Sequence, residues 1–415
     1  MSEIMLVLAA IALLVGSVFL MKLDICYFPA LFFAIKFVAG RVLDFDRVRN
    51  NVMFQLAIIA LLLVTIIIRS NGKWRIGDRL FSRFIPAILA FLVFYSIIGV
   101  LNGHKIFQVF IDCYKYLEII VYYILLRASW NNNIEVLRGV KALSMLMLIL
   151  GTIEIFITTR GGVGLNLIMS LFPIAALLSL YGYVPNTKII IVLSFLVVAT
   201  CQTRTYIVGF VIGFIVLLVL LPKEKRESIL TFTFFVGIVA VMAIGIYGGQ
   251  LLERTLERFM ELSSGFEESG GYRIYDYREA FNRFLDHPIL GNGFGYLKRT
   301  FITKMGWMDW GDFVHCLYLE ILFKVGICGV LYLLMVFGKF IHQIWQHIKV
   351  FKEGDSFVFA VCCGSICSFV AWAFTYTFAP LATIGSMFLS PLIASIVLSN
   401  YYRENKLSLE GDENI

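Results

Sequence analysis

The stretch "TRTYIVGFVIGFIVLLVLLPKEKR" occupies residues 203–226 and decides the fold class. Between Arg204 and the basic cluster that begins at Lys223, no residue carries a charge. An uncharged apolar run of this length, bounded by charged residues, is typical of a helix that crosses a membrane. The run is continuously apolar rather than alternating, which excludes a strand of a membrane-spanning barrel.

Similar runs recur from end to end of the 415-residue chain, which is 60% hydrophobic and only 15% charged. Soluble proteins carry about 25% charged residues. We expect spans near 3–22, 25–41, 52–69, 84–102, 111–127, 138–158, 164–182, 187–202, 205–221, 229–247, 326–345, 357–376 and 380–400. The pattern therefore predicts an all-α polytopic membrane protein with about 12–13 transmembrane helices, since helices satisfy their own backbone in lipid.

Lysine and arginine in the loops predict the orientation of these spans. Basic residues gather in 68–83, in 221–228 and after Lys339. If these loops are cytoplasmic, residues 248–312 face the periplasm or exterior of a bacterium. The loop 41–51 does not fit the alternation, which leaves the orientation of the first spans open.

The same pattern divides the chain into four parts. We expect N-terminal transmembrane helices over 1–247, a large external loop over 248–312, C-terminal transmembrane helices over 313–403 and a polar tail over 404–415.

The external loop predicts two amphipathic helices separated by the flexible stretch "SSGFEESGG" (263–271). The first helix is expected over 251–262. The second, over 272–285, would place Ile274, Tyr277, Phe281 and Phe284 on one face. The following "DHPILGNGFGYLKR" (286–299) is interpreted as a Pro/Gly turn rather than a dinucleotide motif.

The charge and the cysteines indicate no nucleic acid, metal or cofactor. The formal net charge of +7 is best explained by basic loops that set orientation. The eight cysteines form no CxxC pair and lie mostly inside apolar runs, which is unlike a metal site or a disulfide framework.

Four residues are the candidates for chemistry: Arg204, Arg273, Arg278 and His315. Each also has a purely structural interpretation, such as an arginine that snorkels to the interface or a histidine at the membrane edge. Together they suit a different task. Arginine forms bidentate bonds to a diphosphate, and a histidine of near-neutral pKa can accept a proton from a hydroxyl. The set describes metal-independent glycosyl transfer from a lipid-linked donor. Glu320 is a supporting residue that pairs with Lys324 one turn on, or orients the histidine's helix.

The order of these motifs resembles the O-antigen ligase/O-antigen polymerase family of bacterial inner-membrane glycosyltransferases, across roughly 160–400. The segments that carry the resemblance are "QTRTYIVGF" (202–210), "GYRIYDYREAF" (271–281), "HPILGNGFGYL" (287–297) and "VHCLYLEILFKVGICG" (314–329). The resemblance implies a GT-C-like architecture and an undecaprenyl-diphosphate-linked glycan as donor.

By position, the resemblance implies that Arg204 and Arg273 hold the donor diphosphate and that His315 activates the acceptor hydroxyl. Thr203 stands where the family usually has serine, and Cys316 stands where it usually has asparagine. The implied partners are the bilayer, a lipid-linked glycan or lipid A-core as acceptor, and a chain-length regulator.

Three functions remain open from the sequence. We favour a polymerase of O-antigen, capsule or exopolysaccharide that transfers the glycan onto the next lipid-linked repeat unit. A ligase would use the same chemistry with lipid A-core as acceptor. A flippase for lipid-linked oligosaccharides would also need many spans, but it would not need the long amphipathic loop that leads to a histidine.

Overall fold

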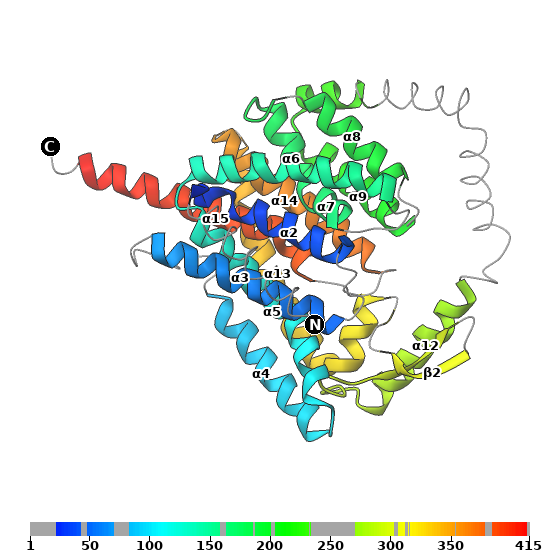
Figure 1. Cartoon of the computed structure of the whole chain (residues 1–415). Helices are drawn as coiled ribbons and strands as arrows, with labels where there is room; N and C mark the ends of the chain where they lie inside the picture. Colours follow the sequence, from blue (N-terminus) through cyan, green and yellow to red (C-terminus); the bar gives the residue numbers. More distant parts are fainter. Residues whose placement is uncertain are drawn as a thin grey trace, which may run out of the picture.

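The computed structural model describes residues 22–42, 48–69, 83–157, 163–185, 187–200, 204–231, 233, 270–302, 306–311, 314, 316–352, 354–377 and 384–412. The described chain is a helical bundle with one short hairpin, which confirms the all-α fold class (Figure 1). The predicted span 3–22, the greater part of 229–247, the loop helix 251–262 and His315 lie outside the described residues.

The other predicted spans each coincide with a helix. In chain order, the described elements before the external loop are η1 (Ile25–Tyr27), α2 (Phe28–Val42), α3 (Val48–Arg69), α4 (Ile85–Leu101), α5 (Ile106–Ser129), α6 (Asn133–Ile157), α7 (Val163–Leu180), α8 (Thr187–Thr200) and α9 (Arg204–Leu220). Those from the loop onward are α12 (Gly270–Asp286), β1 (Lys298–Ile302), β2 (Gly306–Gly311), α13 (Leu317–Phe351), α14 (Ser356–Thr375) and α15 (Gly385–Asp412). Much of the predicted polar tail is thus the end of a helix.

Length and composition identify the helices that can cross a membrane. Within the described residues, Asn133–Ile153, Leu317–Phe351 and Ser356–Thr375 are long and apolar enough. The remaining apolar helices are shorter, between 10 and 17 residues. The lengths agree with a polytopic membrane protein, because local thinning of the bilayer and snorkelling of flanking residues accommodate the shorter apolar helices.

Helix α14 lies at the centre of the bundle and packs against α7, α9, α13 and α15. Small residues permit the close approach: a Cβ on Gly364 would lie 2.6 Å from the backbone nitrogen of Ile174 on α7. Serine hydroxyls then join the helices, with Ser368 donating to the carbonyl of Ser170 at 2.6 Å and Ser365 donating to that of Ser390 at 2.7 Å. Small residues and interhelical hydrogen bonds are the usual means of association in lipid.

Helix α12 confirms the second amphipathic helix of the loop, but only part of its expected face is buried. Phe284 is buried and Tyr277 packs against the same small core. Ile274 and Phe281 are 53% and 47% exposed, whereas Asp276 and Ala280 are buried. The reason is a polar anchor, since the Asp276 carboxylate forms a buried ion pair with Lys298 at the start of β1. A buried charge of this kind needs its partner close by, so the pair determines which side of the helix turns inward.

The hairpin β1–β2 was not predicted. Its antiparallel strands pair Lys298 with Gly311 and Phe301 with Trp307. Figure 1 shows the hairpin and α12 together at one edge of the bundle. Strands this short carry no clear alternation of apolar and polar residues, so periodicity alone does not separate them from a loop.

Helix α13 contains a break. Gly326 has φ +63° and ψ −174°, which divides the element into a short first segment and a long second one. The predicted span 326–345 lies in the second segment, and the first contains Glu320 and Lys324.

Candidate functional site

The structure places the predicted site residues on three elements. Arg204 is the first residue of α9, Arg273 and Arg278 lie on α12, and Glu320 lies in the first turn of α13. His315, like the side chains of Arg204 and Arg273, is outside the described part of the chain. Its two neighbours are described: Val314 and Cys316 are both buried, and Cys316 is the N-cap of α13.

The first residues of α9 and of α13 come to the same end of the bundle. On α9, a Cβ at Gly209 would lie 2.0 Å from Oγ1 of Thr375, near the last turn of α14. One residue beyond that turn, the carbonyl of Tyr376 accepts a hydrogen bond of 3.0 Å from the backbone N–H of Leu317. The end of α14 therefore joins the helix that begins with Arg204 to the helix that begins just after His315.

Helix α12 packs against the beginning of α13. Ala280 and Phe284 form a small core with Val314, Cys316 and Phe323. This cluster places α12 directly beside the segment that contains His315.

The two arginines of α12 differ in their relation to that core. Residues at i, i+4, i+7 and i+11 share one face of a helix, and Arg273, Tyr277, Ala280 and Phe284 have this spacing. Arg273 is therefore positioned on the face that packs toward α13. Arg278 is exposed and lies off that stripe, so the structure does not bring it to the same face.

A third arginine of α12 is held by acids of its own helix. Arg283 forms ion pairs of 2.8 Å with Glu279 and 3.2 Å with Asp286. The hydrogen bond that Arg283 donates to the Glu279 carboxylate raises the pKa of Arg283 above its ordinary value. These bonds commit the guanidinium to its own helix.

The segment 286–299 contains a turn, as predicted, and this turn packs against α13 at Gly326. Gly291 has φ +71°, and a Cβ there would lie 2.4 Å from the carbonyl oxygen of Lys324. Gly326 meets the turn from the other side, because its own Cβ would lie 2.4 Å from the carbonyl oxygen of Ile289. Only glycine tolerates both the positive φ and the close backbone approach.

Backbone hydrogen bonds fasten this turn to the break in α13. The N–H of Ile327 donates to the carbonyl of Pro288 at 2.9 Å, and the N–H of Gly293 donates to that of Lys324 at 2.8 Å. The amide of Asn292 adds a bond of 2.8 Å to the carbonyl of Phe323. Groups that the broken helix cannot pair internally thus find partners in the turn.

The turn also reaches into the N-terminal helices through Phe294. This fully buried ring lies 5.5 Å from the ring of Tyr116 and 5.9 Å from that of Phe91, centre to centre. The N–H of Phe294 donates to the carbonyl of Tyr95 at 3.1 Å.

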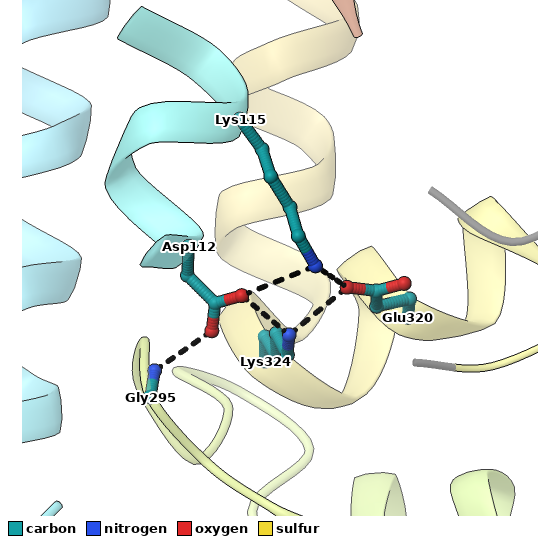
Figure 2. A network of polar contacts seen from close by, with 5 residues as sticks. All are labelled: Asp112, Lys115, Gly295, Glu320 and Lys324. Atoms are coloured by element: carbon teal, nitrogen blue, oxygen red, sulfur yellow. Dashed lines mark hydrogen bonds and ion pairs between the residues drawn. The ribbon is translucent and has the colours of Figure 1, made fainter. Parts of the chain in front are cut away.

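Figure 2 shows four charged side chains between α5 and α13, of which Asp112, Glu320 and Lys324 are buried. Lys115 contacts Glu320 at 2.9 Å and Asp112 at 3.4 Å, and Lys324 contacts the same two acids at 2.9 Å and 2.7 Å. The other oxygen of Asp112 accepts the N–H of Gly295 at 2.8 Å. The set is electrically balanced, with two acids and two bases.

The Glu320–Lys324 pair confirms the predicted i,i+4 interaction. The role of Glu320 in orienting the histidine's helix stays a prediction. Asp112 and Lys115 were missed, although both lie inside the predicted span 111–127. Charged residues inside an apolar span were the available signal, because they are costly there and need partners.

The described residues contain no group of three His, Cys, Asp or Glu side chains arranged to hold a metal ion.

Comparison with known families identifies the segment that contains these elements. A family model described as O-antigen ligase matches residues 189–334, about a third of the chain. No curated protein matches the chain. The matched segment includes α9, α12, the hairpin and the first part of α13, and therefore Arg204, Arg273, Arg278, His315 and Glu320. Asp112 and Lys115 lie outside it.

Proposed function

We propose that the chain is a member of the O-antigen ligase/O-antigen polymerase family of membrane glycosyltransferases, whose model matches residues 189–334, and that it is a polysaccharide polymerase. It would transfer a growing glycan from undecaprenyl diphosphate to the next lipid-linked repeat unit. The product would be an O-antigen, a capsule or an exopolysaccharide. We place it in a bacterial inner membrane, with the transfer site facing the periplasm.

The observation that carries the proposal is the meeting of three segments distant in sequence. The beginnings of α9 and α13 lie at one end of α14, and α12 packs beside the beginning of α13. All three segments lie in the part matched by the family. Two arginines and a histidine on such neighbouring segments support a site for a diphosphate next to a base.

The proposed reaction is a direct displacement. The acceptor sugar hydroxyl gives its proton to His315 while its oxygen attacks the anomeric carbon of the donor glycan. The bond from that carbon to the diphosphate oxygen breaks, and undecaprenyl diphosphate leaves with the bonding electrons. Arg204 and Arg273 stabilise the negative charge on the leaving diphosphate, with Arg278 as a more peripheral contact. The imidazolium then releases its proton to water.

A ligase is the second candidate, because the matching family model is described as O-antigen ligase. The donor, the bonds broken and the site residues would be the same. The acceptor would be lipid A-core instead of a lipid-linked repeat unit.

The test is a gel profile of surface polysaccharide from a deletion strain complemented with wild type, His315→Ala or Arg204→Ala. We expect both variants to insert and accumulate but to lose long-chain glycan. A single repeat on lipid A-core in the deletion strain would identify the polymerase.

Full-length glycan retained on undecaprenyl diphosphate, together with bare core, would identify the ligase instead. An absence of any periplasmic lipid-linked glycan would point to a flippase. Normal chain lengths in His315→Ala would remove the assignment of this residue as the base.

A further inference from the structure

We propose that Asp112 and Lys115 on α5 are positioning residues for the transfer site. They fix the position of the Pro/Gly turn over 286–299, called the glycine turn below, relative to the first segment of α13. Neither residue lies in the family-matched segment, and neither is a reacting group. This inference rests on the proposed function, because it concerns the placement of the chain next to His315.

Asp112 and Lys115 contact two separate segments, the glycine turn and the beginning of α13. Asp112 binds the N–H of Gly295 in the turn and the ammonium of Lys324 on α13. Lys115 binds Glu320, which lies in the first turn of α13. The N–H of Glu320 in turn donates to the carbonyl of Cys316, the residue after His315, at 3.1 Å. Two residues of one helix thus hold both the turn and the start of α13.

The four charges depend on one another because three of them are almost completely buried and the Lys115 side chain is only 11% exposed. Asp112, Glu320 and Lys324 are 4%, 1% and 4% exposed. Among the described residues, the second oxygen of Glu320 has no hydrogen-bond partner, so this carboxylate depends on Lys115 and Lys324. Removal of one base would leave an excess buried negative charge, and the first turn of α13 would shift to relieve it.

A second buried pair on α5 provides the control. Lys36 on α2 binds Glu118 at 2.7 Å, with Tyr122 completing the cluster. Glu118 is fully buried, and it lies on α5 three residues after Lys115. Within the described part of the chain, the hydrogen bonds of Lys36 and Glu118 join α2 to α5 and do not involve the glycine turn or α13. Loss of Lys36 therefore breaks a comparable ion pair without loosening the site.

The experiment compares purified full-length wild type, Lys115→Gln, Lys115→Arg and Lys36→Gln in proteoliposomes. The substrate is the undecaprenyl-diphosphate-linked repeat unit isolated from the deletion strain. For Lys115→Gln we expect kcat per folded molecule to fall about 10- to 100-fold with little change in KM, as a displaced reacting group would cause. Lys115→Arg should recover part of the loss, and Lys36→Gln should stay near wild type.

Amide hydrogen exchange provides a readout that does not depend on activity. Peptides over 289–296 and 316–325 should exchange faster in Lys115→Gln and should be unchanged in Lys36→Gln. If the single variant does not accumulate, the charge-balanced Asp112→Asn/Lys115→Gln retains the neutral Glu320–Lys324 pair and takes its place in both measurements.

The outcomes separate this inference from the proposed function. Wild-type kcat or unchanged exchange in a folded Lys115 variant would overturn the positioning role, while an inactive His315→Ala would still support the transfer reaction. Failure of both the single and the double variant to accumulate would overturn it too, because the network would then serve folding. A wild type that transfers no glycan would refute the proposed function, with the exchange data still testing the geometry.

Discussion

At the scale of single residues, the positions with the least freedom are glycines where two backbones touch. Gly326 and Gly291 face each other, and a Cβ on either one would lie 2.4 Å from a backbone carbonyl oxygen of the opposite segment. Their positive φ values add a conformational requirement to the steric one. The break in α13 therefore depends on glycine in both contacting segments, the glycine turn and α13 itself.

A substitution at Gly326 tests this specification. Gly326→Ala should destabilise the protein by about 2 kcal/mol or more, because the residue would be strained at φ +63° and its Cβ would collide with the carbonyl of Ile289. Thermal unfolding in detergent measures the effect. Gly338→Ala is the matched control on the same helix, since no atom lies within 4 Å of its Cβ position. There the change should be neutral or stabilising, up to about 1 kcal/mol. Equal stability of the two variants would contradict the account.

At the scale of elements, α12 shows that a helix can be predicted correctly while its buried face is predicted only in part. Apolar spacing identified the helix, but the Asp276–Lys298 pair decided its orientation. The pattern could not show this, because Lys298 belongs to a strand whose existence was itself unpredicted. Asp112 and Lys115 were visible as charges in a span, yet their partners lie about two hundred residues on. Periodicity describes a segment, whereas ion pairs depend on contacts between segments.

The orientation of α12 predicts unequal roles for its arginines. Arg273→Ala should lower kcat/KM by at least about 100-fold, because it removes the bidentate diphosphate contact that we propose for this residue. Arg278→Ala should cost clearly less, since this residue is exposed and off the face that packs toward α13. Transfer kinetics with the lipid-linked repeat unit measure both values. Equal losses would mean that the diphosphate contacts α12 from its exposed side.

At the scale of the whole molecule, the helical bundle was predictable and its internal connections were not. Apolar runs identified the helices from α2 to α15, because each run is a local property of the chain. The insertion of Phe294 between α4 and α5 depends on the glycine turn, which brings distant segments together. Arg204 and Arg273 were chosen from sequence for their charge, and the packing of α9, α12 and α13 places their backbones on neighbouring elements.

The buried ring of Phe294 predicts a connection between the two halves of the chain. Phe294→Ala should destabilise the protein by about 3–5 kcal/mol through loss of packing against Phe91 and Tyr116. Thermal unfolding, together with limited proteolysis of the external loop, measures it. Phe281→Ala removes a largely exposed ring of the same loop and should cost much less. A small effect at Phe294 would show that the turn is held by its hydrogen bonds alone.

The contacts of the glycine turn also bear on how this protein could be recombined with its relatives. A chimera joined at residue 189, where the family match begins, would transplant Phe294, Glu320 and Lys324 without the aromatic socket and the two charges that receive them. Such a graft would carry every proposed reacting group and still misplace them. Exchange of α4 and α5 together with 189–334 is the smallest swap that preserves these interfaces. The segment that must be exchanged as a unit is therefore larger than the segment that the family model matches.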